Sequence, residues 1–150
     1  MDSWLHYWRP EDVEKFMGVS GFKMDCTGSD QERFHKEYKK GDIVWFHSIV
    51  NGEHLLLGRL LLDKKLTKQE ASEHVGRPFA ASIKFETYWV AEKPWHKIQR
   101  IPIREIAPML EFVPSNPLPQ NYNGQNFQAI RRLSDSDHSL IQDEWDIWME

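Results

Sequence analysis

The chain has 150 residues, a length that suits one domain with its own hydrophobic core. Its formal net charge is −4, and because Cys26 is the only cysteine, an intrachain disulfide is excluded. The charge also excludes the strongly basic footprint of a protein that binds nucleic acid mainly through phosphate contacts.

Charged and aromatic residues are distributed unevenly along the chain. Residues 135–150 hold six of the 23 acidic residues and no lysine or arginine, so the other 134 residues combine 19 basic with 17 acidic groups and carry +2. Seven tryptophans are many for one domain. This surplus indicates either an aromatic core or flat surfaces on which a ligand stacks.

The first predicted elements are a strand and a helix. The stretch "SWLHYW" (residues 3–8) alternates as a strand does. Pro10 then opens "PEDVEKFM", which has acidic residues in its first turn, and Gly18 or Gly21 ends this helix.

The next segment is predicted to be a loop, a short helix and a hairpin. After the loop "GFKMDCTG", Ser29 or Asp30 caps a short helix. The stretches "GDIVWFHSIV" (41–50) and "HLLLGRLLLD" (54–63) are strands. The Asn-Gly pair between them supplies the positive φ angles of a tight hairpin turn.

A polar helix and a third long strand follow. Thr67 caps the helix, Glu70 occupies the capping-box position, and Gly76 ends it. The strand is predicted over residues 82–93, where apolar and polar residues alternate, and Pro94 ends it.

The last third is predicted to hold a long loop between short elements and a C-terminal helix. Residues 101–110 form a short strand and a helical turn closed by Pro108. The proline- and asparagine-rich stretch "LEFVPSNPLPQNYNGQN" is a loop, in which residues 114–124 are the expected lid over a ligand. "FQAIRRLS" is the last strand. The helix over 134–148 repeats apolar residues at helical spacing, namely Leu140, Ile141, Trp145 and Trp148.

The order of these elements predicts an α+β domain, built on a small twisted antiparallel β-sheet or β-barrel that short helices flank. The opening "MDSWLHYWRPED" lacks the basic and apolar regions of a signal peptide. The longest apolar run is interrupted by Arg59 and is too short to cross a bilayer. With a single cysteine, these features favour a cytoplasmic protein without a membrane partner.

The sequence contains none of the common catalytic or metal-binding motifs. It has no Gly-x-Ser-x-Gly elbow, no His-Glu-x-x-His, no Cys-x-x-Cys and no glycine-rich phosphate loop. We therefore predict no catalytic residue, no metal and no cofactor. A hydrolase that uses Cys26, or a histidine paired with a carboxylate, remains the least favoured alternative.

Aromatic residues occur at the ends of several predicted strands, where they would suit a flat ligand. Nucleobases are held by stacking on such rings, and polar neighbours such as His47 and Ser48 would read their edges. The alternative is that strand alternation sends Trp45 into the core and leaves His47 as an ordinary histidine. Basic residues interleave with these aromatics and would contact phosphates; they are Lys93, Lys97, Arg100 and Arg131.

Four segments in this order resemble the PUA-like superfamily, and within it the EVE/YTH-like branch. They are the first strand "SWLHYW", the loop "GFKMDCTGSDQERFHKEYKKGD", the pair "KKGDIVWFHSI" and "LLLGRLLL", and the closing "QAIRRLSDSDHSLIQDEWD". Together they cover nearly the whole chain. The Trp-x-Gly-Val-Arg-Asn segment of EVE domains is replaced here by "VSGFKMDC".

Members of that branch bind modified bases of DNA or RNA, taking a flipped base into an aromatic-lined pocket. The resemblance therefore implies a non-enzymatic nucleic-acid-binding module, whose effector would be a separate protein. A small-ligand or protein-interaction adaptor on the same fold is the main alternative. By position, the resemblance nominates as pocket residues Phe22, Phe46, His47, Ser48, Trp89 and Trp95.

Overall fold

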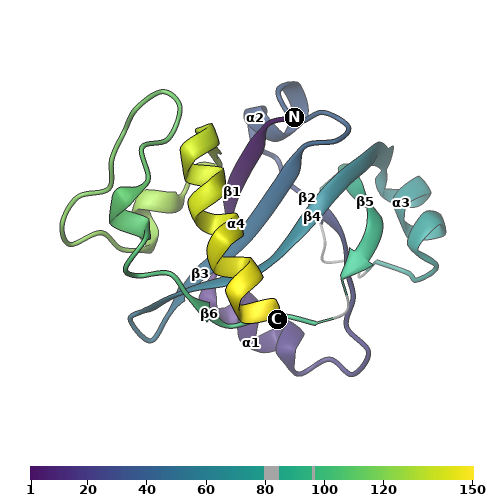
Figure 1. Cartoon of the computed structure of the whole chain (residues 1–150). Coiled ribbons are helices and arrows are strands. Elements are labelled where there is room, and N and C mark those ends of the chain that lie inside the picture. Colours follow the sequence, from purple (N-terminus) through teal and green to yellow (C-terminus); the bar gives the residue numbers. More distant parts are fainter. Residues whose placement is uncertain (80–84, 96) are drawn as a thin grey trace.

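A computed structural model describes residues 1–79, 85–95 and 97–150 of the chain (Figure 1). The strands are β1 (Ser3–Tyr7), β2 (Met24–Gly28), β3 (Ile43–Val50), β4 (Glu53–Thr67), β5 (Thr87–Trp95), β6 (Ile101–Pro102) and β7 (Arg131–Leu133). The helices are α1 (Pro10–Met17), α2 (Glu32–Lys36), α3 (Lys68–Val75) and α4 (Asp135–Met149), with 3-10 turns η1 (Ala107–Met109) and η2 (Gly124–Phe127).

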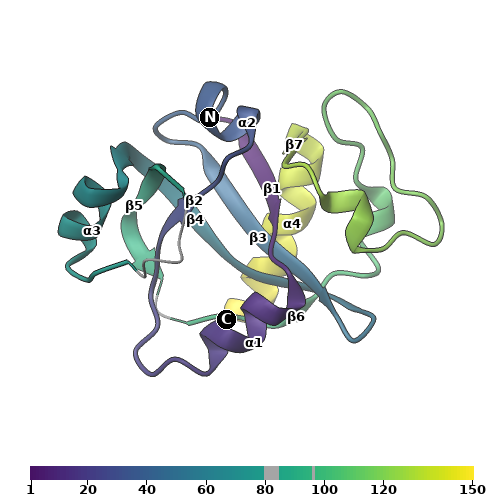
Figure 2. The same ribbon diagram turned by 180° about the vertical axis from the view of Figure 1, so that it is seen from behind.

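The described strands form one mixed, open sheet. Their order is β2-β5-β4-β3-β1-β7, and β6 pairs with β4. The α+β class is confirmed, but the expectation of an antiparallel sheet is corrected, because β1 runs parallel to β3. Figure 2 shows β1 between β3 and β7. A helix, a strand and a second helix separate β1 from β3 along the chain, and a connection of that length permits parallel pairing.

Strand β4 joins the two halves of the sheet. Its first part pairs with β3 and β6, and its last part pairs with β5 (Figure 1). Both faces of its first part are covered. This explains the nearly continuous leucine run in the sequence, because a strand buried on both faces does not alternate.

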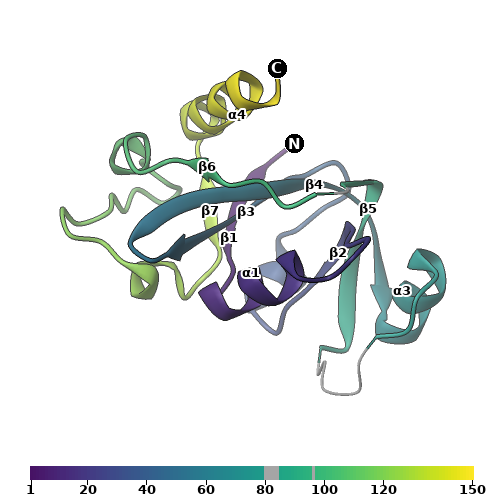
Figure 3. The ribbon, with the colours of Figure 1, turned by 90° about the horizontal axis from the view of Figure 1, so that it is seen from below.

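Helices cover both faces of the sheet and help form two large core clusters, and a third, smaller cluster includes Ala71 of α3. Figure 3 shows α1 on one side and α4 on the other. Phe46 packs in the cluster that includes Val13 of α1, whereas Trp45 packs in the cluster that includes Ile141 and Trp145 of α4. Neighbouring residues of β3 therefore serve opposite faces, as the two-residue period of a strand requires.

The local signals for turns and caps are confirmed. Asn51 and Gly52 have φ angles of 52° and 79°, and Val50 pairs directly with Glu53 across the hairpin. Thr67 and Glu70 form the reciprocal capping box of α3.

Three predictions in the middle of the chain differ from the structure. Residues 24–28, which were expected to be loop, form the edge strand β2, whose sequence "MDCTG" has no clear apolar alternation. Gln31, rather than Ser29 or Asp30, is the N-cap of α2, because the Ser29 hydroxyl accepts the Gln31 N–H at 3.0 Å and forms a turn before the helix.

The third difference concerns β5, whose predicted first residues 82–84 lie outside the described residues. The strand does not end at Pro94 but continues to Trp95. Its register against β2 shifts between the Met24 and Cys26 pairs. A proline is tolerated at such an irregularity because the regular hydrogen-bond ladder is interrupted there.

The predicted elements near the C-terminus are also modified. Pro108 lies inside η1 instead of closing a helical turn. The last strand has only three residues, because Phe127 ends η2 and residues 128–129 form a bend. In α4, Ile141 and Trp145 are buried, but Trp148 is 53% exposed. The helix extends past the sheet-facing cluster, so its last turn has no core to contact.

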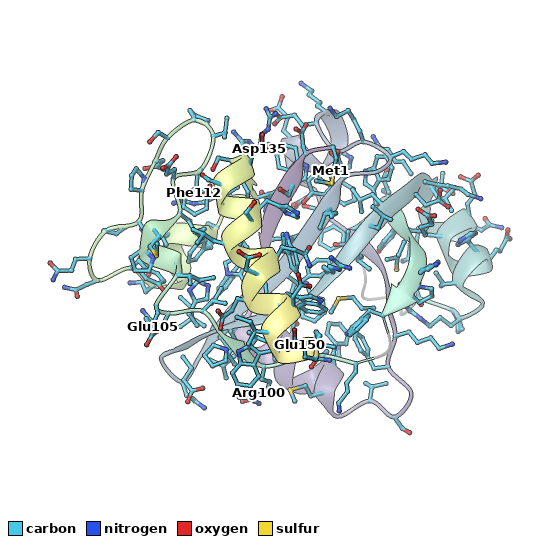
Figure 4. The ribbon with its side chains drawn as sticks, in the orientation of Figure 1. Met1, Arg100, Glu105, Phe112, Asp135 and Glu150 are labelled. Carbon is cyan, nitrogen blue, oxygen red and sulfur yellow. The ribbon has the colours of Figure 1, made fainter. Side chains whose placement is uncertain are left out.

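Asp137 ties the long loop to the start of α4. Its carboxylate accepts the backbone N–H groups of Glu111 and Phe112, both at 2.8 Å, and of Ser134 at 3.0 Å. Figure 4 shows Phe112 beside the N-terminal end of α4, near Asp135. The carboxylate therefore fixes residues 111–112 of the loop against the start of α4.

Candidate ligand-binding pocket

Four of the six aromatic or polar residues nominated from the sequence meet in one place, inside the core. Phe46 is fully buried, Trp89 is 6% exposed, and the partly buried Phe22 and Trp95 pack against the same cluster. The indole N–H groups of Trp89 and Trp95 are buried without a hydrogen-bond partner among the described residues. The protein thus uses these rings for core packing, and Trp95 also contacts Trp145 of α4, with ring centroids 5.3 Å apart.

His47 lies on the opposite face of β3 and belongs to a buried hydrogen-bond network of three side chains. Its Nδ1 is 2.8 Å from Nε2 of His54, and Nδ1 of His54 is 2.8 Å from the hydroxyl of Tyr122. Ser48 is also buried, and its hydroxyl has no partner in the described part of the chain.

The environment keeps the imidazoles of His47 and His54 uncharged. Burial lowers the pKa of His47 well below its ordinary value, and the neighbouring His54, His6 and Arg131 lower it further. Burial and the nearby Arg104 lower the pKa of His54 to about 3. Both rings are therefore neutral at neutral pH.

The basic residues expected to contact phosphates divide into two groups. Lys93, Lys97 and Arg100 are exposed on β5 and on the segment before β6. Arg131 is half-buried and donates to the carbonyl oxygens of Asn116 and Asn126 at 2.8–3.1 Å. Arg131 thus holds the long loop in place.

A pocket of about 550 Å³ lies where β1 ends and α1 begins. The rings of Tyr7 and Phe127 form part of its wall, and Arg9 and Gly124 complete it. Side-chain amides supply most of the remaining polar lining, from Gln31, Asn123, Gln125 and Gln128. None of the six nominated residues is among the residues that line it.

The wall of this pocket is internally fixed. The Tyr7 and Phe127 ring centroids are 5.9 Å apart and their planes differ by 10°. The Gln31 amide donates to the carbonyl of Gln128 at 3.2 Å and accepts the N–H of Ile130 at 2.7 Å. A flat ligand that stacks on one ring would therefore lie parallel to the other.

His47 supports this wall from behind. Its ring centroid is 4.5 Å from that of Phe127 and 5.2 Å from that of Tyr7. The nominated residue is therefore adjacent to the pocket without facing the space inside it.

The pocket lining is apolar over most of its area and nearly uncharged. Arg9 is the one charged residue among those that line it, and its guanidinium is 3.3 Å from Asp12 and 3.7 Å from Glu11. The rim therefore offers no net positive charge to a phosphate.

Sequence reasoning missed Tyr7, Gln31 and Phe127 because they come from three distant segments. One local signal was available. The stretch "QNYNGQNFQ" (120–128) carries six side-chain amides around a single Asn-Gly pair, which is unusual for a loop with only a packing role.

The region of Cys26 does not resemble a nucleophile site. Burial, and then the charge of Asp25, raises the pKa of the Cys26 thiol to about 12, and Arg77 approaches the sulfur at 3.9 Å. The thiol therefore stays protonated at neutral pH. Within residues 1–79, 85–95 and 97–150, no group of three or more His, Cys, Asp or Glu residues is placed to hold a metal ion.

Comparisons of the chain with protein-family models, with curated proteins and with solved structures found no match. None of the helices in the described residues is long and apolar enough to cross a bilayer.

Proposed function

We propose that this protein is a non-enzymatic, PUA-like module that binds a single nucleobase, modified and unpaired or flipped from a DNA or RNA strand, in the pocket that Tyr7 and Phe127 line. The observation that carries the proposal is a neutral, amide-rich cavity with two parallel aromatic rings in its wall. The segment order of the sequence, which resembles EVE/YTH-like domains, supports it as well.

The size and polarity of the pocket suit a base. A volume of about 550 Å³ is within the range of small-molecule sites. Stacking on an aromatic ring contributes roughly 1–3 kcal/mol per base. Amides that both donate and accept, such as those of Gln125 and Gln128, match the donor and acceptor pattern of a base edge.

The rim charge favours a second candidate, a module that binds a free, uncharged planar compound such as a nucleoside. Arg9, which lines the pocket, is paired with two carboxylates, those of Glu11 and Asp12. A strand of phosphates would be repelled by this excess of carboxylates, whereas a ligand without phosphate would not.

Isothermal titration calorimetry with two sets of ligands separates these candidates. The first set is single- and double-stranded oligonucleotides with and without a modified cytosine or adenine, and the second is the corresponding free nucleosides. Binding of an oligonucleotide supports the first candidate, and binding of nucleosides alone supports the second. A folded protein that binds neither set contradicts both.

Gln128→Ala is expected to weaken binding of the best ligand by about 2- to 10-fold, because one hydrogen bond contributes about 0.5–1.5 kcal/mol. The side chain is exposed and lines the pocket, so stability should be unchanged. The matched control is Gln120→Ala, which removes an exposed amide of the same loop outside the pocket. Equal affinities of the two variants would argue against recognition by Gln128.

Gly124→Ala is expected to weaken binding roughly ten-fold through a steric effect, since overpacking costs about 1–3 kcal/mol. A Cβ at this position would lie 2.7 Å from the Tyr7 hydroxyl, so the ring must shift. At Gly18 an added Cβ meets its nearest atom at an ordinary 3.6 Å, which makes Gly18→Ala the control. Titration calorimetry of both variants measures the difference, and unchanged affinity in Gly124→Ala would place the ligand elsewhere.

A further inference from the structure

Three polar rings form a continuous hydrogen-bonded chain from the centre of the sheet to the pocket wall. His47 comes from β3, His54 from β4, and Tyr122 from the loop before η2. Phe127 packs against all three, with ring centroids 4.5 Å from His47, 5.4 Å from His54 and 5.9 Å from Tyr122. The chain therefore links the sheet to the ring that lines the pocket.

The charged groups that act on this chain are cations. Arg104, which follows β6, lies 4.7 Å from the centroid of the Tyr122 ring and lowers the pKa of His54. Arg131 of β7 lies 5.6 Å from the centroid of the Phe127 ring and lowers the pKa of His47. His6 and the Tyr7 ring, both of β1, also lie beside His47, and neither supplies negative charge to an imidazolium. An added proton on either imidazole would therefore be repelled.

The hydrogen bonds that join His47, His54 and Tyr122 have a preferred direction. A neutral imidazole carries one N–H, so the two hydrogen bonds can run toward Tyr122 or away from it. Nε2 of His47 is buried without a partner among the described residues. If the bonds ran toward His47, this atom would be an N–H without an acceptor; in the other direction it is only an acceptor without a donor, which is tolerated more often. The bonds therefore run from Nδ1–H of His47 to His54, and from Nδ1–H of His54 to the Tyr122 oxygen.

We propose that His47, His54 and Tyr122 are positioning residues of the pocket. Uncharged and donating in this one direction, they hold the segment 122–127 against the sheet and keep the Phe127 ring parallel to Tyr7. The pocket wall is then preformed, in place of a lid that closes from the loop 114–124. The importance of this wall for ligand binding rests on the proposed function, but the positioning itself can be measured in the free protein.

The first experiment is ¹⁵N NMR of the histidine rings in the free protein. His47 and His54 are both expected to be Nδ1–H tautomers and to remain neutral from pH 8 to pH 5. A proton on Nε2 of His54, or a cationic form of either ring in this range, would overturn the proposed direction.

The second experiment compares Tyr122→Phe with Tyr38→Phe. Both hydroxyls are buried, but that of Tyr38 has no hydrogen-bond partner in the part of the chain that the structure describes, so its loss should change little. In Tyr122→Phe the His54 Nδ1–H loses its acceptor. We expect the ring nitrogen signals of both His54 and His47 to shift, and amide exchange in 124–127 to accelerate about ten-fold.

Binding of the nucleosides and oligonucleotides then separates two kinds of failure. A Tyr122→Phe variant with wild-type amide exchange and ring signals overturns the positioning role, even if the wild type binds a ligand. If the wild type binds none of these compounds, the proposed function fails, while the exchange and tautomer measurements still decide the positioning role. Accelerated exchange in Tyr122→Phe, with Tyr38→Phe unchanged, supports it.

Discussion

Replacing Phe127 by alanine is expected to lower the free energy of unfolding by about 3–5 kcal/mol and to abolish ligand binding. The ring is 3% exposed and contacts Tyr7, His47 and Tyr122. Its loss would leave a cavity beneath the pocket and remove half of the aromatic wall. Urea denaturation measures the first effect, and titration calorimetry with the best-binding nucleoside or oligonucleotide measures the second.

Phe46→Ala is the matched control, because Phe46 is fully buried in the cluster on the other face of the sheet. We expect a similar loss of stability but retained affinity under conditions in which both variants are folded. The opposite result, with binding lost in Phe46→Ala and kept in Phe127→Ala, would restore the aromatic set nominated from the sequence and contradict the pocket described here.

Acid is expected to destabilise the protein well before its carboxylates titrate. In the unfolded chain His47 and His54 take up protons as the pH falls below about 6.5. In the folded protein their pKa values are lowered, to about 3 for His54, so proton uptake favours the unfolded state. The histidine contribution is therefore fully present above pH 6.5 and is lost as the pH falls, at about 1.4 kcal/mol per pH unit for each ring.

Urea denaturation at several pH values between 7.5 and 5 measures this slope. His54→Phe should reduce the slope, since one buried neutral histidine is removed, although the variant is less stable throughout. His74→Gln alters an exposed histidine of α3 and should leave the slope unchanged. A free energy of unfolding that is constant between pH 7 and pH 5 would contradict neutral, buried imidazoles.

Elements with local causes were predictable from the sequence. The Asn-Gly turn and the capping box at Thr67 are determined by residues within a few positions of one another, and both were identified. The parallel pairing of β1 with β3 depends on contacts between residues about forty positions apart, such as Leu5 with Trp45. No local pattern records such a pairing.

The candidate site was less predictable than the fold, for a geometric reason. Phe46 and His47 are neighbours in sequence, so they were assigned to one pocket, but strand alternation places them on opposite faces. Tyr7, Gln31 and Phe127 meet only because β1, the loop before α2 and η2 converge at one place. Aromatic content could indicate that flat surfaces exist, but it could not indicate which rings face a cavity.

The position of β1 between β3 and the edge strand β7 affects how the chain reaches its native state during synthesis. β1 is made before the other described strands, and its neighbour β7 is made more than a hundred residues later. One edge of β1 therefore has no native partner until residues 131–133 have been made, and contacts between such distant segments form slowly. Until then the nascent chain carries an unpaired edge on a tryptophan-containing strand, and unpaired edges of this kind favour non-native association.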